Sequence, residues 1–125
     1  MRLLLDTHIL LWCLQGSRKL SKPARARIGA SREVFVSSVS IWEIAIKNGS
    51  GKLTIDMSQL ASEITYAGML ELKISHIHAA RVRHLPGIHR DPFDRMLVAQ
   101  AMCESMKLLT ADRVLADYSE LVEIV

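Results

Sequence analysis

The sequence predicts an α/β fold: a central, mainly parallel sheet of four to five strands with helices on both faces, in three α/β/α layers. Short apolar runs alternate with longer segments of helical spacing, and several runs are apolar at every position, as in strands buried on both faces. Half of the 125 residues are hydrophobic and only 5% are aromatic, so the predicted core is aliphatic. A chain of this length suits one domain, here residues 1–125.

Two strands and three helices are predicted in the first part of the chain. Apolar residues recur at helical spacing in the helices, and Gly16 follows the first helix as a typical C-terminal signal. Ser21 and Ser40 are typical N-caps. The predicted elements are a strand at Arg2–Leu5, a helix at Thr7–Gln15, a helix from Ser21 to about Gly29, a strand at Val34–Val36 and a helix from Ser40 to about Lys47.

The rest of the chain continues the alternation. Ser75 is a typical N-cap, and Pro92 suits the first turn of a long helix. The predicted elements are a helix at Ser58–Ala67, a strand at Met69–Leu72, a helix from Ser75 to about His84, a helix from Pro92 to about Met106, a strand at Leu108–Thr110, a helical turn at Arg113–Asp117 and a strand at Leu121–Val125.

Composition narrows the function classes. The net charge of +3, from 16 Lys and Arg against 13 Asp and Glu, is mildly basic and agrees with a polyanionic partner without requiring one. No apolar stretch approaches the ~18 residues of a membrane span. Asp6 ends the first apolar run too early for a signal peptide, so we expect a cytosolic protein. Cys13 and Cys103 lack metal-ligand spacing and are expected to be reduced thiols.

Two acids follow predicted strands. Asp6 comes directly after the first strand, and Asp112 comes two residues after Thr110. Ligands of open α/β sheets bind at the carboxyl ends of strands, so these carboxylates are expected to converge. The alternative is that each acid only caps the next helix.

Two further acids interrupt apolar helical surfaces. Glu43 is the only charged residue between Val39 and Ile46, and an unpaired buried carboxylate is costly. Its structural alternatives are a capping box with Ser40 or an i,i+4 pair with Lys47. Asp94 lies on the apolar stripe of its helix, although a first-turn acid is also favoured by the helix dipole.

Four converging carboxylates would need a cation, because clustered acids repel and take up protons. Oxygen ligands without a matched Cys or His set suit Mg²⁺, with Mn²⁺ as a substitute. Such ions activate water for attack on a phosphodiester. The sequence contains no serine-triad order and no glycine-rich phosphate loop that would indicate other chemistry.

In four segments the sequence resembles the PIN-domain family, specifically the VapC-type ribonuclease toxins of toxin–antitoxin pairs. The segments are Leu3–His8, Ser38–Lys47, His89–Ala101 and Leu108–Asp112, in the family's order. The resemblance implies a PIN-like fold, Mg²⁺- or Mn²⁺-dependent endoribonuclease activity, a homodimer and inhibition by a small antitoxin protein. The implied catalytic and metal-binding acids are Asp6, Glu43, Asp94 and Asp112.

Other residues are assigned supporting roles. Thr110 matches the family's hydroxyl residue beside the metal, Thr7 follows Asp6, and Asp91 is expected to cap a helix more than to bind metal. The candidate RNA contacts are Lys22, Arg25, His89, Arg90 and Arg95. The basic run around Lys22 and Arg25 has a plain alternative as a solvated helix face.

A non-catalytic PIN-fold module that binds RNA or protein is the main alternative to the nuclease. A zinc site at His76 and His78 is disfavoured, because residues two apart on a helix face different ways. An aspartyl-phosphate enzyme would need an acid where His8 stands. Trp12 and Trp42 are expected in the core, not as base-stacking platforms.

Overall fold

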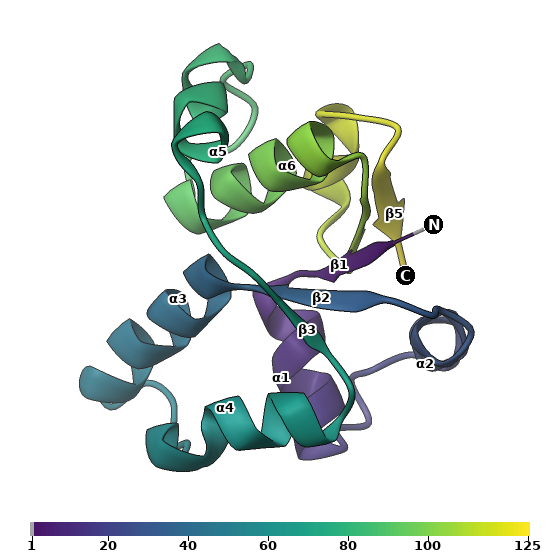
Figure 1. Ribbon diagram of the computed structural model, residues 1–125, viewed down its shortest axis with the longest axis vertical. Coiled ribbons are helices and arrows are strands. Elements are labelled where there is room, and N and C mark those ends of the chain that lie inside the picture. Colours follow the sequence, from purple (N-terminus) through teal and green to yellow (C-terminus); the bar gives the residue numbers. More distant parts are fainter. Residues whose placement is uncertain (1) are drawn as a thin grey trace.

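The computed structural model describes residues 2–125 and has five parallel strands between two layers of helices (Figure 1). The strand order is β3-β2-β1-β4-β5, and all neighbours pair in parallel, which confirms the predicted fold class. The strands are β1 at Leu3–Leu5, β2 at Val34–Ser37, β3 at Leu70–Leu72, β4 at Lys107–Thr110 and β5 at Val122–Ile124.

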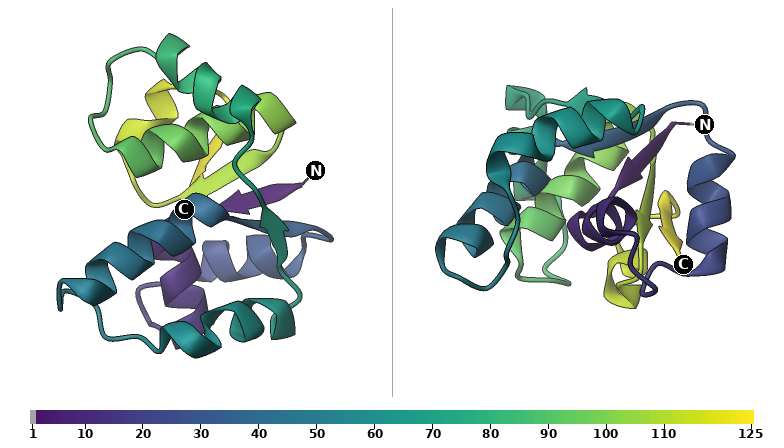
Figure 2. Two further views of the ribbon diagram at one scale, coloured as in Figure 1. Left: turned by 60° about the vertical axis from the view of Figure 1, so that its left-hand side comes forward. Right: turned by 90° about the horizontal axis from the view of Figure 1, so that it is seen from below.

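Helices cover both faces of this sheet (Figure 2). Helices α1, α2 and α4 contribute apolar side chains to the core on one face, while α6 covers the other face with α5 packed against it. The helices are α1 at Thr7–Gln15, α2 at Lys22–Gly29, α3 at Ser38–Gly49, α4 at Met57–Tyr66, α5 at His76–Arg81 and α6 at Pro92–Glu104, with 3₁₀ turns η1 at Val82–His84 and η2 at Arg113–Asp117.

The central strand explains why its sequence is an unbroken apolar run. Leu3 and Leu5 belong to the core beneath α1, and Leu4 belongs to the core beneath α6. All three side chains are fully buried, because successive residues of a strand face opposite sides of the sheet. Strand β1 therefore links the two cores and places Asp6, the next residue, at one edge of the sheet.

Two boundary predictions were wrong. Helix α3 begins at Ser38 with Ser37 as its N-cap, not at Ser40. Strand β2 extends to Ser37, which pairs with Leu72, so the helix begins at the next residue. Ser40 is consequently a buried residue inside α3 and forms no capping box with Glu43. The helix predicted from Ser75 is capped as expected, but α5 ends at Arg81 and η1 follows it.

The prediction for Trp42 was also wrong. Its side chain is 60% exposed and meets Phe93 edge-on, with ring centroids 5.2 Å apart. Trp12 is partly buried against the core, as predicted, and Cys13 and Cys103 are free thiols.

None of the helices among residues 2–125 combines the length and apolarity that a membrane crossing needs.

Replacing Leu4 by Ala should lower the free energy of unfolding by about 3 kcal/mol, because the change leaves a cavity in a fully buried site. The control is Leu70→Ala on edge strand β3, where the side chain is 44% exposed and should matter much less. Urea unfolding of both variants measures the difference, and equal losses would contradict the central position of β1.

Candidate metal centre

Asp6 is positioned by the end of β1 and the start of α1. Its side chain is buried, and Oδ1 accepts a hydrogen bond from the Ile9 backbone N–H at 2.8 Å, so the residue is an N-cap. Oδ2 accepts a hydrogen bond from the Thr110 hydroxyl. Asp6 thus caps α1 with one carboxylate oxygen and contacts the neighbouring strand with the other. It is therefore both a helix cap and a candidate metal ligand.

Thr110 connects Asp6 with Asp112. This fully buried residue ends β4, and its hydroxyl oxygen accepts a hydrogen bond from the Asp112 backbone N–H at 3.0 Å. Asp112 Oδ1 accepts from the Val114 N–H at 3.1 Å and caps η2. One hydroxyl group therefore joins two acids that are more than 100 residues apart in the sequence.

His89 connects Asp112 with Asp94. Its Nε2 lies 3.3 Å from Asp112 Oδ2 and 3.6 Å from Asp94 Oδ2. Its Nδ1 accepts a hydrogen bond from the Asp91 N–H at 3.0 Å, so the neutral ring carries its hydrogen on Nε2. These three side chains form the metal-compatible group among residues 2–125, with ligand atoms within 4.8 Å of one another. In this tautomer the Nε2–H group of His89 faces the two acids, and Nε2 has no lone pair for an ion.

Glu43 is a buried carboxylate with only one of its oxygens paired. Oε2 accepts a hydrogen bond from Lys47 Nζ at 2.9 Å, which is the i,i+4 pair considered from the sequence. Oε1 is buried and has no hydrogen-bond partner among residues 2–125. An unpaired buried carboxylate oxygen is costly, so its natural complement is a cation.

The acids influence one another electrostatically. Burial first, and then the charges of Asp91, Asp6 and Glu43, raise the pKa of Asp94 to about 7, against a smaller opposing effect of His89. Burial also raises the pKa of Asp6, although the hydrogen bonds from Thr110 and Ile9 oppose this. Three of the four predicted acids therefore lie close enough to repel, and Asp112 joins them through Thr110 and His89.

This donor set fits a hard divalent cation. The groups that converge are carboxylates, and Glu43 Oε1 lacks any protein donor within residues 2–125. A bound cation would lower the raised pKa of Asp94 and remove the repulsion. The metal-compatible group among residues 2–125 includes Asp94 and Asp112 but not Asp6 or Glu43, which connect to it through Thr110 and through their charge effect on Asp94. The ring nitrogens of His78 already contact the Ser75 N–H and Glu104, so the His76–His78 pair offers no free ligand from His78.

Two supporting residues have clear local roles. Asp91 caps α6, with Oδ1 accepting from the Phe93 N–H at 2.8 Å and the Asp94 N–H at 3.2 Å, which confirms the predicted cap. Thr7 is buried and donates to Ser40 Oγ at 2.9 Å, which ties α1 to α3. Thr7 therefore holds together the two helices that carry Asp6 and Glu43.

The candidate RNA contacts are in different places. Arg90 is exposed in the loop before α6 and has no hydrogen-bond or ion-pair partner among residues 2–125, so its charge is available to a phosphate. Arg25 binds the Ser17 carbonyl oxygen at 2.9 Å, beyond the end of α1 opposite to Asp6, and Lys22 is exposed on the same helix α2. A helix as long as α1 spans roughly 13 Å, and Asp6 lies at its other end. Arg25 and Lys22 therefore lie away from the acids.

Arg95 has a role that the sequence did not indicate. Its guanidinium donates to backbone carbonyls of the preceding loop, so we drop it from the RNA contacts. The buried Tyr118 was missed altogether, although its hydroxyl contacts His89. The only sequence signal for Tyr118 is that a buried tyrosine hydroxyl usually has a polar partner, which does not say where that partner lies.

Replacing Asp94 by Asn should stabilise the protein at high pH without divalent cations. The unfolding free energy of the wild type falls as the pH rises from about 4 to about 7, because the unfolded chain releases this proton first. The Asn variant avoids this loss, so we expect it to be more stable by on the order of 2 kcal/mol at pH 8 and equally stable near pH 4. Urea unfolding in EDTA measures both values.

The exposed Asp117 provides the control, since Asp117→Asn should change stability little at either pH. An Asp94→Asn variant that is less stable than the wild type at pH 8 would contradict the raised pKa.

The sequence and the fold of this chain are similar to those of known proteins. Ribonuclease VapC22 of Mycobacterium tuberculosis is 27% identical over 116 residues, which are 88% of this chain and 86% of that protein. A structure of VapBC2 from Rickettsia felis bound to a promoter DNA fragment has a TM-score of 0.72 at 13% identity, covering 100% of this chain and 98% of that one.

A toxin–antitoxin complex from Klebsiella pneumoniae has a TM-score of 0.68 at 19% identity, covering 96% of this chain and 94% of that one. These structural likenesses concern the fold. The PIN domain model matches residues 3–121, which include all four acids and the whole sheet up to β5. The chain therefore belongs to the PIN domain family.

Proposed function

We propose that residues 1–125 form one nuclease domain that hydrolyses RNA phosphodiester bonds with Mg²⁺, or Mn²⁺ as a substitute. One observation carries this proposal: burial and the charges of Asp91, Asp6 and Glu43 raise the pKa of Asp94 to about 7, and Glu43 Oε1 is buried without a partner among residues 2–125. A non-catalytic module has no use for this cluster of carboxylates, whereas a metal-dependent nuclease needs carboxylates as ligands for its cation.

Asp6, Glu43, Asp94 and Asp112 are the residues that would hold the cation. When bound, such an ion lowers the pKa of a water molecule and stabilises the leaving oxygen of a phosphodiester. Thr110 orients Asp6 through its hydroxyl group, and Lys47 neutralises one oxygen of Glu43 while the other stays free. Arg90, exposed in the loop before α6, is the side chain that we assign to a substrate phosphate.

The relatives support RNA as the substrate and a toxin as the biological role. VapC22 is named a ribonuclease, and the solved relatives include toxin–antitoxin complexes. We therefore propose that this protein acts on RNA in the cytosol and is inhibited by a small antitoxin protein.

Asp6→Asn should lower RNA cleavage by at least about 100-fold, since even outer-shell partners of a metal can have effects of that size. Asn still caps a helix, so the variant should fold. Cleavage of a labelled RNA in Mn²⁺, with and without EDTA, measures the effect, and growth after induced expression measures toxicity. Asp117→Asn, at an exposed acid, is the matched control and should keep full activity.

The non-catalytic alternative has a different signature. It predicts that wild-type protein cleaves no RNA in Mn²⁺ or Mg²⁺ and that Asp6→Asn leaves growth inhibition intact. Either result would contradict the proposed nuclease.

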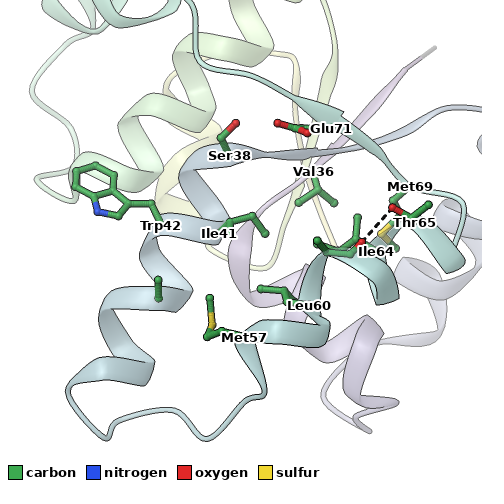
Figure 3. Close-up of a pocket in the computed structure, with 12 residues that line it drawn as sticks. Val36, Ser38, Ile41, Trp42, Met57, Leu60, Ile64, Thr65, Met69 and Glu71 are labelled. Atoms are coloured by element: carbon green, nitrogen blue, oxygen red, sulfur yellow. Dashed lines mark hydrogen bonds between the residues drawn. The ribbon is translucent and has the colours of Figure 1, made fainter.

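An apolar pocket of about 510 Å³ between α3 and α4 is the surface that we assign to the antitoxin (Figure 3). Its apolar lining comes from Val36, Ile41, Trp42, Ala45, Met57, Leu60, Ala61, Ile64 and Met69. A groove of this kind suits the apolar side of a short partner helix. Toxin–antitoxin complexes among the solved relatives favour this occupant over a small molecule.

Ala61→Arg should abolish binding of the antitoxin without changing RNA cleavage, because Ala61 is exposed on α4 and the larger cation would block the groove. Copurification with a candidate antitoxin that is expressed together with this chain measures binding. Ser62→Arg on the same helix, outside that pocket, is the control. If the Ala61→Arg variant still bound the antitoxin, the assignment of this pocket to the antitoxin would be wrong.

We also propose a homodimer. Exposed apolar side chains outside the antitoxin pocket, Ile46 on α3 and Ile77 on α5, are the ones that a second copy would cover. Light scattering should give twice the 14.0 kDa of one chain. A monomer at micromolar concentration would contradict it.

A further inference from the structure

Arg95 forms hydrogen bonds with the backbone of the segment that precedes α6. The residue directly follows Asp94, and its guanidinium turns back over the preceding loop. Its terminal nitrogens donate to four backbone carbonyls: Nη1 to Pro86 at 2.9 Å and His89 at 3.4 Å, and Nη2 to Val82 at 3.2 Å and Leu85 at 3.5 Å. One side chain thus replaces the regular hydrogen bonding that this loop lacks.

Tyr118 completes the same network from the far end of the chain. Its ring is buried beside α6 at 8% exposure, and its hydroxyl oxygen accepts from the His89 N–H at 2.7 Å. The hydroxyl donates to the His89 carbonyl at 3.3 Å and accepts from Arg95 Nη1 at 3.2 Å. A hydroxyl group has one hydrogen and two lone pairs, so this one is fully used.

The residue held at both backbone groups is His89, which contacts the acids. Its ring is fixed by the Asp91 N–H on Nδ1, and Nε2 faces Asp94 and Asp112. Asp94 lies in α6 and Asp112 lies two residues after β4, and His89 Nε2 is within 3.6 Å of a carboxylate oxygen of each. The position of the His89 ring therefore sets how the two carboxylates face one another.

We propose that Arg95 and Tyr118 form a clamp that positions His89, and through it Asp94 and Asp112, for cation binding. Among residues 2–125, neither Arg95 nor Tyr118 has a hydrogen bond or ion pair with an acid side chain, so both are positioning residues. Hydrogen-bond donors to ligand carboxylates orient the ligands, and their loss typically weakens metal binding 10- to 100-fold. The meaning for catalysis rests on the proposed nuclease function, whereas the clamp itself is a property of the protein without metal.

Tyr118→Phe tests the clamp, because it removes only the hydroxyl group and keeps the ring in the core. The matched control is Tyr66→Phe, where the side chain is 95% exposed. Two readouts are needed at pH 8: Mn²⁺ affinity by calorimetry, and the ¹⁵N shifts of the His89 ring without metal. We expect Tyr118→Phe to weaken Mn²⁺ binding by about tenfold and to shift His89 away from a single Nε2–H tautomer. Tyr66→Phe should change neither.

A merely structural role for Tyr118 gives a different result. The melting temperature would fall while the His89 shifts and the Mn²⁺ affinity stayed as in the wild type, and this would overturn the clamp. If Tyr118→Phe does not fold, Arg95→Lys serves instead, because lysine cannot reach the same carbonyls from two nitrogens. Arg83→Lys, at an exposed arginine of η1, is then the control.

The two proposals can fail separately. If the wild type itself binds no Mn²⁺, the nuclease proposal fails, and the ring shifts of His89 in Tyr118→Phe still decide the clamp. If the wild type binds Mn²⁺ and Tyr118→Phe binds it equally well with unchanged His89 shifts, only the clamp fails.

Discussion

The hydrogen bond from the Thr110 hydroxyl to the buried Asp6 carboxylate joins the two central strands at the edge where the acids meet. It depends on the parallel pairing of β1 with β4, which sets Leu5 beside Leu109 and places Thr110 level with Asp6. Because the same hydroxyl accepts from the Asp112 N–H, a shift in this register would separate both acids. Helices α3 and α6 bring the other two acids to this edge, so the whole candidate site is fixed by the pairing at the centre of the sheet.

The buried, mutually repelling acids at this edge of the sheet lower the stability of the folded protein. Burial and neighbouring negative charge raise the pKa of Asp94, and burial raises that of Asp6, so ionising these groups in the folded protein costs free energy. Lys47 compensates only one oxygen of Glu43. Burial of the apolar cores on both faces of the sheet stabilises the fold and offsets this cost. Such a local conflict is expected at a functional site, and a divalent cation would resolve it.

Much of this arrangement follows from local sequence signals. Apolar runs predicted the five strands, and acids directly after strands predicted the positions of Asp6 and Asp112. The start of α3 was misplaced because Ser37, Ser38 and Ser40 can all cap a helix, and the pairing of Ser37 with β3 decides among them. Trp42 was misjudged because α3 looks apolar all round, while only the side bearing Val39 and Ile44 faces the core. The links among Arg95, Tyr118 and His89 span up to 29 residues and leave no local pattern.

A crystal of the wild-type protein soaked in Mn²⁺ and measured near the manganese absorption edge tests the central claim most directly. The account predicts an anomalous peak at the carboxyl edge of the sheet, within bonding distance of carboxylate oxygens of Asp6 and Asp94, with Glu43 and Asp112 around it. The peak should be absent in Asp6→Asn. A fully soaked crystal without a peak there, or with its strongest peak elsewhere on the protein, would contradict the assignment of these four acids to one metal centre.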